Sequence, residues 1–204
     1  GDNWQKDAAA NWSADCPPLR TFVPDDNFEQ ALIDLGLDTG PPDDFVPTDS
    51  IRGLLALNVS GRAIADLTGI ADFLALATLN CSGNQLSVLD LTQNRALTSL
   101  DCSANTLTEL NLKNGNNAAL ATVDARNNPG LLCISVDDGF APPATWQKDA
   151  AANWQANCRP GETFVPDDNF EQALVELGLD AAPLDNYVPT ASIATVTELD
   201  LADR

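Results

Sequence analysis

The sequence predicts an α/β solenoid, a leucine-rich repeat whose coils stack through parallel strands between a helical N-terminal cap and a disulfide-linked C-terminal cap. Three observations predict this fold. A leucine motif recurs every 21 to 23 residues, and the chain as a whole recurs with a period of 142 residues. Each copy of the long period also contains the same short helical pattern, FVPDDNFEQAL. Short periods of this kind are typical of repeat proteins whose units bury their apolar faces only by stacking.

The short repeat reads L-x-x-L-x-C-x-x-N-x-L-x-x-L from Leu76 and again from Leu97, and related versions begin at Leu54 and Leu120. Residues two apart on a strand point to the same side, so Leu79 and Cys81 should both point inward. Stacked coils would align such residues in columns about 4.8 Å apart. The expected columns are Leu57, Leu79, Leu100 and Val123, and Val59, Cys81, Cys102 and Ala125.

Two further sets of residues complete each coil. The asparagines should turn inward and satisfy backbone groups where the chain leaves the strand. These are Asn84, Asn105 and Asn128. A second apolar run should line the opposite wall of the solenoid, formed by Leu86, Leu89, Leu91, Leu107, Leu110, Leu112, Leu131, Ile134 and Val136.

The long repeat divides the chain. Residues 1–62 and 143–204 are identical at 37 of 62 aligned positions. We expect residues 1–20 to be the C-terminal cap of a preceding unit, and residues 159–204 to be the N-terminal cap and first coil of a following one. Residues 21–158 should form one complete unit: a cap at 21–50, coils at 51–139 and a C-terminal cap at 140–158.

The N-terminal cap should contain a helix. Asp26-x-x-Glu29 fits a capping box, and Gly36 fits a helix stop. Helical spacing places Phe28, Ala31, Leu32 and Leu35 on one face.

In the C-terminal cap, Asp149 to Asn153 suggests a short helix held against the last coil by Trp146 and Trp154. Carbohydrate binding is the alternative role for these tryptophans, and packing is favoured.

The five cysteines fall into two classes. Cys81 and Cys102 lie in a core column, too widely spaced for easy bridging, and are expected to be free thiols. Cys133 and Cys158 are expected to form a disulfide that joins the C-terminal cap to the stack, which fits an oxidising compartment. Cys16 is equivalent to Cys158 and should be unpaired within this chain.

Composition excludes several functions. The chain has 30 acidic and 10 basic residues, a net charge of −20, which argues against nucleic acid and anionic membranes as partners. Histidine, the commonest general base, is absent, and no acid, base and nucleophile constellation appears, so no enzyme is expected. No stretch approaches the roughly 18 apolar residues of a membrane span, so no direct insertion is expected.

One candidate binding site lies on the outward face of the strands. Its most prominent residues are Asn58, Asn80, Asp101, Asp124 and Arg126. In repeat proteins, this strand face often binds partners. This one is small and polar, and only Arg126 belongs to the residue types that dominate binding hot spots. An inert face is therefore the favoured alternative.

Acidic clusters form a second candidate, a Ca²⁺ site. Calcium needs six to eight oxygen ligands. The residues concerned are Asp25, Asp26, Asp43, Asp44, Asp137 and Asp138. Their spacing matches no defined calcium loop, and helix-cap and turn roles explain most of them without a metal. No other cofactor is expected.

Taken together, the segments FVPDDNFEQALIDLGLD, LNCSGNQLSVLDL, LDCSANTLTELNL and NNPGLLCISVDD resemble the secreted, adhesin-like leucine-rich-repeat surface proteins of flavobacteria and other Bacteroidetes. The resemblance implies secretion, display at the cell surface and large multi-domain parents. The expected function is a structural repeat of a long surface protein or filament, mediating cell-surface architecture or adhesion, with neighbouring copies of the unit as partners. The alternative is an adhesin that recognises a glycan or protein on the strand face.

Overall fold

The structure is a computed structural model that describes residues 19–159 and 161–199. The chain divides into two compact units, with the boundary along the chain between Ala156 and Asn157. Cys16, expected to be unpaired, and the predicted cap at 1–20 up to residue 18 lie outside the described residues.

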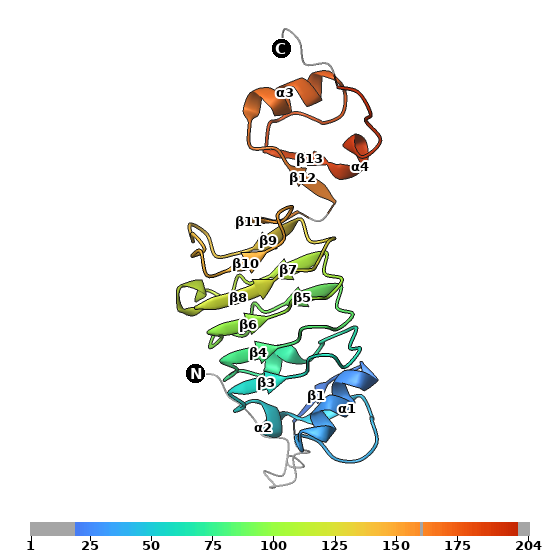
Figure 1. Cartoon of the computed structure of the whole chain (residues 1–204), viewed down its shortest axis with the longest axis vertical. Coiled ribbons are helices and arrows are strands. Elements are labelled where there is room, and N and C mark those ends of the chain that lie inside the picture. The colour runs from blue at the N-terminus through green and yellow to red at the C-terminus, as the bar shows by residue number, and fades with distance from the viewer. Residues whose placement is uncertain (1–18, 160, 200–204) are drawn as a thin grey trace, which may run out of the picture. The chain divides into compact units, whose positions relative to one another are not determined.

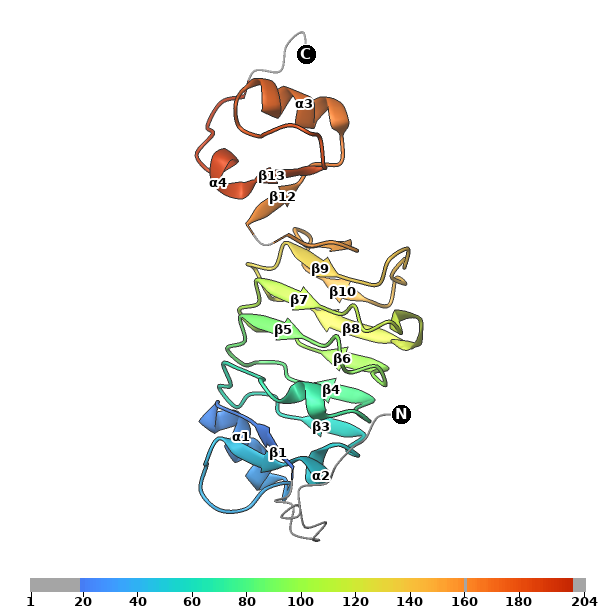
Figure 2. The same cartoon turned by 180° about the vertical axis from the view of Figure 1, so that it is seen from behind.

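The first unit is the predicted parallel solenoid, and it has about five turns instead of the four coils that the leucine motif marks. One sheet consists of β3 (Ala56–Asn58), β4 (Thr78–Asn80), β6 (Ser99–Asp101), β8 (Thr122–Ala125) and β10 (Gln147–Lys148), paired in chain order. The second consists of β5 (Val88–Asp90), β7 (Glu109–Asn111), β9 (Cys133–Ser135) and β11 (Asn153–Gln155). Figure 1 shows the stacked coils, and Figure 2 shows β5, β7 and β9 from behind.

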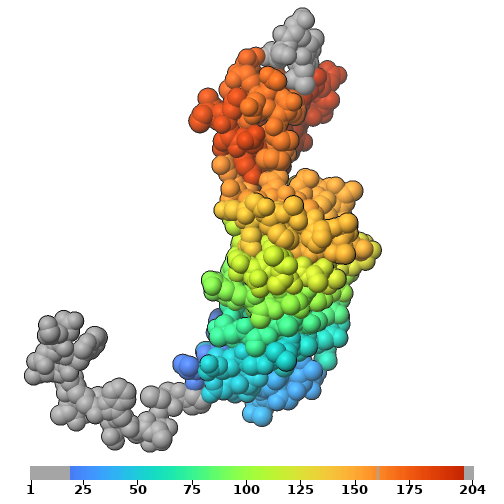
Figure 3. All heavy atoms as spheres, turned by 90° about the vertical axis from the view of Figure 1, so that its left-hand side faces the viewer, coloured from blue at the N-terminus to red at the C-terminus, as the bar shows by residue number. Residues whose placement is uncertain are grey.

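The core lies between the two sheets. The strands pair in register, with Leu57 opposite Leu79, Leu79 opposite Leu100, and Leu100 opposite Val123. Every residue of both predicted columns and of the predicted opposite wall is buried, so these predictions are confirmed. On the face seen in Figure 3, the coils follow one another as continuous bands.

The asparagine prediction is also confirmed. Asn105 donates through Nδ2 to the carbonyls of Cys81 (3.0 Å) and Cys102 (3.1 Å), and its Oδ1 accepts from Leu86 N (3.0 Å). Asn84 and Asn128 make the same kind of bonds one coil before and one coil after. Each amide therefore joins two coils where the backbone leaves the strand and would otherwise be unsatisfied.

The N-terminal cap pairs β1 (Arg20–Phe22) antiparallel with β2 (Phe45–Pro47) and adds α1 (Asp26–Asp34) and α2 (Thr48–Ile51). The helix ends at Asp34 and is followed by Gly36, the predicted stop, in a left-handed conformation (φ 74°), with Leu37 N bonded to Leu32 O. Phe28, Ala31 and Leu32 are buried, but Leu35 is 49% exposed, so its assignment to the buried face is wrong.

The predicted capping box is wrong. Asp25, not Asp26, caps α1, and its Oδ1 accepts from Phe28 N at 2.9 Å. The Glu29 side chain turns away from the helix end and is fully buried. Its two oxygens accept from Asp43 N (2.7 Å) and Asp44 N (2.8 Å) in the loop before β2. Glu29 thus accepts hydrogen bonds from two backbone N–H groups that are distant in the sequence, and not from the backbone at the start of its own helix.

In the described residues, two short 3₁₀ helices lie between strands, η1 (Ile70–Asp72) in the first coil and η2 (Asn117–Ala119) at the end of the third. Because η1 occupies the second half of its coil, β5 is the terminal strand of its sheet in the described residues. The first coil therefore presents η1 to the cap instead of a strand.

The predicted helix at residues 149–153 is wrong, because this segment forms the turn between β10 and β11 and closes a fifth coil. Asp149 accepts from Asn127 N (2.9 Å) and Asn128 N (2.7 Å), a role like that of the asparagine oxygens below it. The three alanines favour a helix, but the strand edges of β8 and β9 supply backbone hydrogen-bond partners, and the segment pairs with them instead. The packing role of the tryptophans is confirmed: Trp146 is buried and meets Trp154 edge-on at 5.4 Å.

The second unit repeats the N-terminal cap. It contains β12 (Glu162–Phe164), α3 (Asp168–Glu176), β13 (Tyr187–Pro189) and α4 (Thr190–Ile193), with β12 and β13 antiparallel. Asp167 caps α3 as Asp25 caps α1. The buried Glu171 accepts from Asp185 N (2.7 Å) and Asn186 N (2.9 Å), which repeats the Glu29 arrangement.

Candidate functional site

The strand-face residues Asn58, Asn80, Asp101 and Asp124 form one column across four strands. In each, Oδ1 accepts from the backbone N–H two residues later, at 3.0 to 3.1 Å. The structure therefore brings the predicted binding residues together. It also gives them a local role, because these bonds turn the chain out of each strand.

The end of this column carries an ion pair. Arg126 donates through Nη2 to Asp124 Oδ2 at 2.5 Å and through Nε to Oδ1 at 2.9 Å. The hydrogen bond from Arg126 lowers the pKa of Asp124 below its ordinary value, and the same bond raises the pKa of Arg126. A ligand that approaches Arg126 would have to compete with Asp124 for its donors.

The carboxylates proposed for Ca²⁺ are largely engaged by donors of the protein. Asp43 pairs with Arg20 at 2.8 Å, and the hydrogen bond from Arg20 lowers the pKa of Asp43. Asp137 accepts from Gly115 N and Asn117 N, both at 2.9 Å, and Asp138 pairs with Lys113. Within residues 19–159 and 161–199, no three carboxylate or thiol groups are placed to hold a metal ion. Asp26 and Asp44 join no such group, and calcium binding stays an untested prediction.

The disulfide between Cys133 and Cys158 is confirmed, and Cys81 and Cys102 are free, as expected. Burial raises the pKa of the Cys81 thiol to about 12, and burial likewise raises that of Cys102 well above its ordinary value. Thiolate is the reactive form of cysteine, so both side chains act as small core hydrophobes.

The two core thiols are expected to resist iodoacetamide at pH 8 and to react fully in denaturant, which peptide mapping by mass spectrometry would show. Because the folded pKa of Cys81 exceeds the unfolded value, its contribution to stability is complete below about pH 9 and is lost as pH rises toward 12. Rapid alkylation of Cys81 in the native protein would contradict its burial.

Removal of the disulfide should destabilise the protein without unfolding it at room temperature. The bond closes a loop of about 25 residues, for which chain entropy predicts a loss of about 3 kcal/mol. Urea unfolding of Cys133→Ser, compared with the wild type in the oxidised and the dithiothreitol-reduced state, measures this loss. An unchanged midpoint in Cys133→Ser would show that the loop is constrained equally well in the reduced chain.

Several structurally important residues escaped the sequence prediction. A second buried set of asparagines, Asn94, Asn114 and Asn117, bonds backbone carbonyls on the other side of the coils. Asn94 follows Leu91 by three residues, the spacing by which Asn84 follows Cys81, so this signal was present in the sequence. The role of Glu29 had no such local signal, because its partners lie 14 and 15 residues away.

No protein-family description matches the sequence, and no curated protein matches it. Among solved structures, the chain is similar to the functional domain of InlJ from Listeria monocytogenes, which includes a cysteine ladder. The sequence identity is 24% and the TM-score 0.41, over 70% of this chain and 29% of that one.

A second likeness is to ZmpB from Clostridium perfringens, in a structure of its CBM51-2 and INT domains with GlcNAc. It has 25% identity and a TM-score of 0.39, over 48% of this chain and 21% of that one. The chain thus spans less than a third of either protein, and at these scores the likenesses carry no argument about function. No helix in the described residues is long and apolar enough to cross a membrane.

Proposed function

We propose that this chain is a non-enzymatic structural repeat of a long extracellular bacterial surface protein or filament, in which tandem leucine-rich-repeat units build cell-surface architecture or mediate adhesion. The observation that carries the proposal is the recurrence, after 142 residues, of a cap that folds twice in the same way. Both copies have the same aspartate at the helix start and the same buried glutamate. Both also have a threonine pair at 2.9 Å, Thr21 with Thr48 and Thr163 with Thr190.

The disulfide supports the extracellular part of the proposal. Such bonds persist in oxidising environments and are rare in the reducing cytosol. The net charge of −20 favours solubility and keeps units apart except where specific contacts join them. Neighbouring copies of the unit are accordingly the partners we propose.

The strand face supports a structural rather than a ligand-binding role. Its column of Asn and Asp side chains is already used to end the strands. Aromatic anchors, which dominate binding hot spots, do not occur at its outward positions. No specific observation favours the adhesin alternative, which becomes an outcome of the experiment below.

The test combines location with assembly. Antibodies raised against this chain are expected to label intact cells, and electron microscopy of the released native protein should show a regular axial repeat. As a control, the chain is applied to glycan and surface-protein arrays beside a variant with Asp101→Ala. Absence of surface label would contradict the proposal. A defined ligand that the variant no longer binds would favour the adhesin.

A further inference from the structure

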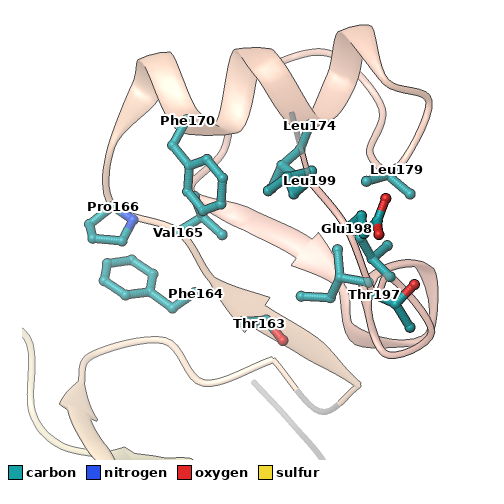
Figure 4. Close-up of a pocket in the computed structure, with 12 residues that line it drawn as sticks. Thr163, Phe164, Val165, Pro166, Phe170, Leu174, Leu179, Thr197, Glu198 and Leu199 are labelled. Atoms are coloured by element: carbon teal, nitrogen blue, oxygen red, sulfur yellow. The ribbon is translucent and has the colours of Figure 1, made fainter. Parts of the chain in front are cut away.

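The second unit has an apolar face on which Phe170 and Leu199 are exposed, while Val165 and Leu174 are buried. We call it the second-cap inner face; it consists of Val165, Phe170, Leu174, Leu179, Ile193 and Leu199. These side chains surround a cavity of about 390 Å³, toward which the Phe170 ring, Leu174 and Leu199 are turned (Figure 4). Exposed apolar side chains gathered around a hollow, as Phe170 and Leu199 are, are a common feature of contact sites.

The first unit has the same face, and there it is covered. All six residues recur unchanged from positions 142 earlier, so Phe170 corresponds to Phe28 and Leu199 to Leu57. Phe28 is 0% exposed and Phe170 37%. Leu57 is 2% exposed and Leu199 40%. Phe170 and Leu199 therefore lack the cover that their counterparts have, while Val165 and Leu174 are buried in the second unit as Val23 and Leu32 are in the first.

What covers the face in the first unit is the rest of the first coil, residues 59–76. The Phe73 ring stacks on Phe28 with centroids 6.3 Å apart, and Ile64, Leu67 and Ile70 join the same buried cluster. Gly69 makes the close approach possible. It has φ 101°, and a Cβ at this position would lie 2.8 Å from the Phe22 carbonyl oxygen. The cap thus requires glycine at this point of the coil.

Polar groups of the cap also contact this coil. Asp25 Oδ2 accepts from Ala65 N (2.8 Å) and Asp66 N (3.0 Å). Thr21 donates through Oγ1 to Asp72 Oδ2 at 2.6 Å, and Asn27 Nδ2 donates to Ala63 O at 3.2 Å.

The second cap has the same three polar residues, Thr163, Asp167 and Asn169, at the corresponding positions. Among the described residues, Asp167 keeps its capping bond to Phe170 N and Thr163 its contact with Thr190. The bonds that Thr21, Asp25 and Asn27 make to the first coil have no counterparts in the second cap, among the residues that the structure describes.

We infer that the second-cap inner face is a docking site for a leucine-rich coil with the chemistry of residues 59–76. Phe170 receives an aromatic ring, Asp167 receives two adjacent backbone N–H groups, and Thr163 donates to an aspartate. A small apolar ligand would use the cavity but would not supply the backbone N–H groups and the aspartate that Asp25 and Thr21 bond in the first unit. The inference rests on the proposed tandem repeat and adds to it how a cap recognises the coil it covers.

The test lengthens the whole chain after Arg204 by a second copy of residues 63–158. Hydrogen exchange of the α3 amides is expected to slow by about 100-fold, to the rate of the α1 amides in the same molecule. Phe170→Ala should abolish most of this gain, and so should Gly69→Ala placed only in the added copy. Ala71→Ser in the added copy, at an exposed position, is the matched control and should change nothing.

Unchanged exchange of α3 beside a folded added segment would overturn the inference, and so would failure of the added coils to fold against the cap. Sedimentation of the original chain supplies a second criterion. A dimer that Phe170→Asp dissociates would mean that another copy occupies the face, which also overturns it. Because this experiment measures docking in one molecule, it can fail while the surface and filament experiment succeeds, or the reverse.

Discussion

Replacement of Glu29 by alanine is expected to lower the free energy of unfolding of the first unit by about 3–5 kcal/mol. The Glu29 carboxylate is fully buried and accepts two backbone hydrogen bonds, from Asp43 N and Asp44 N. Bonds to charged groups contribute roughly 1.5–3 kcal/mol each, and their loss leaves two donors without partners. Urea denaturation followed by circular dichroism measures the effect.

The chain supplies its own control for this prediction. Glu171→Ala removes the same two bonds in the second unit, so it should disorder the second cap while the unfolding of the first unit is unchanged. Glu29→Gln keeps the shape and one acceptor oxygen, and should cost less than alanine. Equal midpoints for wild type and Glu29→Ala would show that the loop before β2 finds other acceptors.

Asn105→Ala is expected to destabilise the solenoid by a similar amount, about 3–5 kcal/mol. Asn105 is buried in the middle of the stack, and it satisfies the carbonyls of Cys81 and Cys102 and the N–H of Leu86. Each buried backbone group left unsatisfied costs roughly 1–3 kcal/mol. Thermal and urea unfolding of the purified variant measure the loss.

Gln93→Ala is the matched control for the asparagine, because Gln93 is exposed and its side chain bonds only the neighbouring Thr92 at 3.4 Å among the described partners. It should change stability by no more than about 0.5 kcal/mol. Hydrogen exchange should further show that Asn105→Ala loosens β4 and β6, on the two coils it joins, before the cap. Uniform loosening of the whole unit would argue against a local role for the asparagine.

The pattern of the coils was readable from the sequence because each coil repeats the same short-range requirement. A leucine every few residues and an asparagine three residues after Cys81 or Cys102 specify which side chains enter the core. Stacking then places equivalent residues in register, as Leu57, Leu79 and Leu100 show. The disulfide between Cys133 and Cys158 was predictable on the same basis, since excluding the core thiols leaves one pair within a complete unit.

The two ends of the solenoid were less predictable, because side chains there form hydrogen bonds with residues distant in the sequence. The local pattern Asp26-x-x-Glu29 predicts a capping box. In the structure, however, the Glu29 carboxylate accepts from the loop before β2, and Asp25 is the N-cap residue. The alanines after Asp149 favour a helix locally. The segment nevertheless forms a fifth coil, because β10 and β11 pair with the open strand edges of the fourth coil. In both places a tertiary hydrogen bond outweighs a local preference.

The sequence by itself thus determined the solenoid, its core columns, its asparagine ladder and its 142-residue period, because all of these follow from spacing along the chain. Only the tertiary structure decided that Glu29 and Asp149 accept backbone hydrogen bonds from distant residues and that the last segment joins the stack. It alone also decided that two identical cap faces differ in cover. The physical reason is the same in each case: burial and hydrogen bonding depend on which residues, distant in the chain, come to lie beside them.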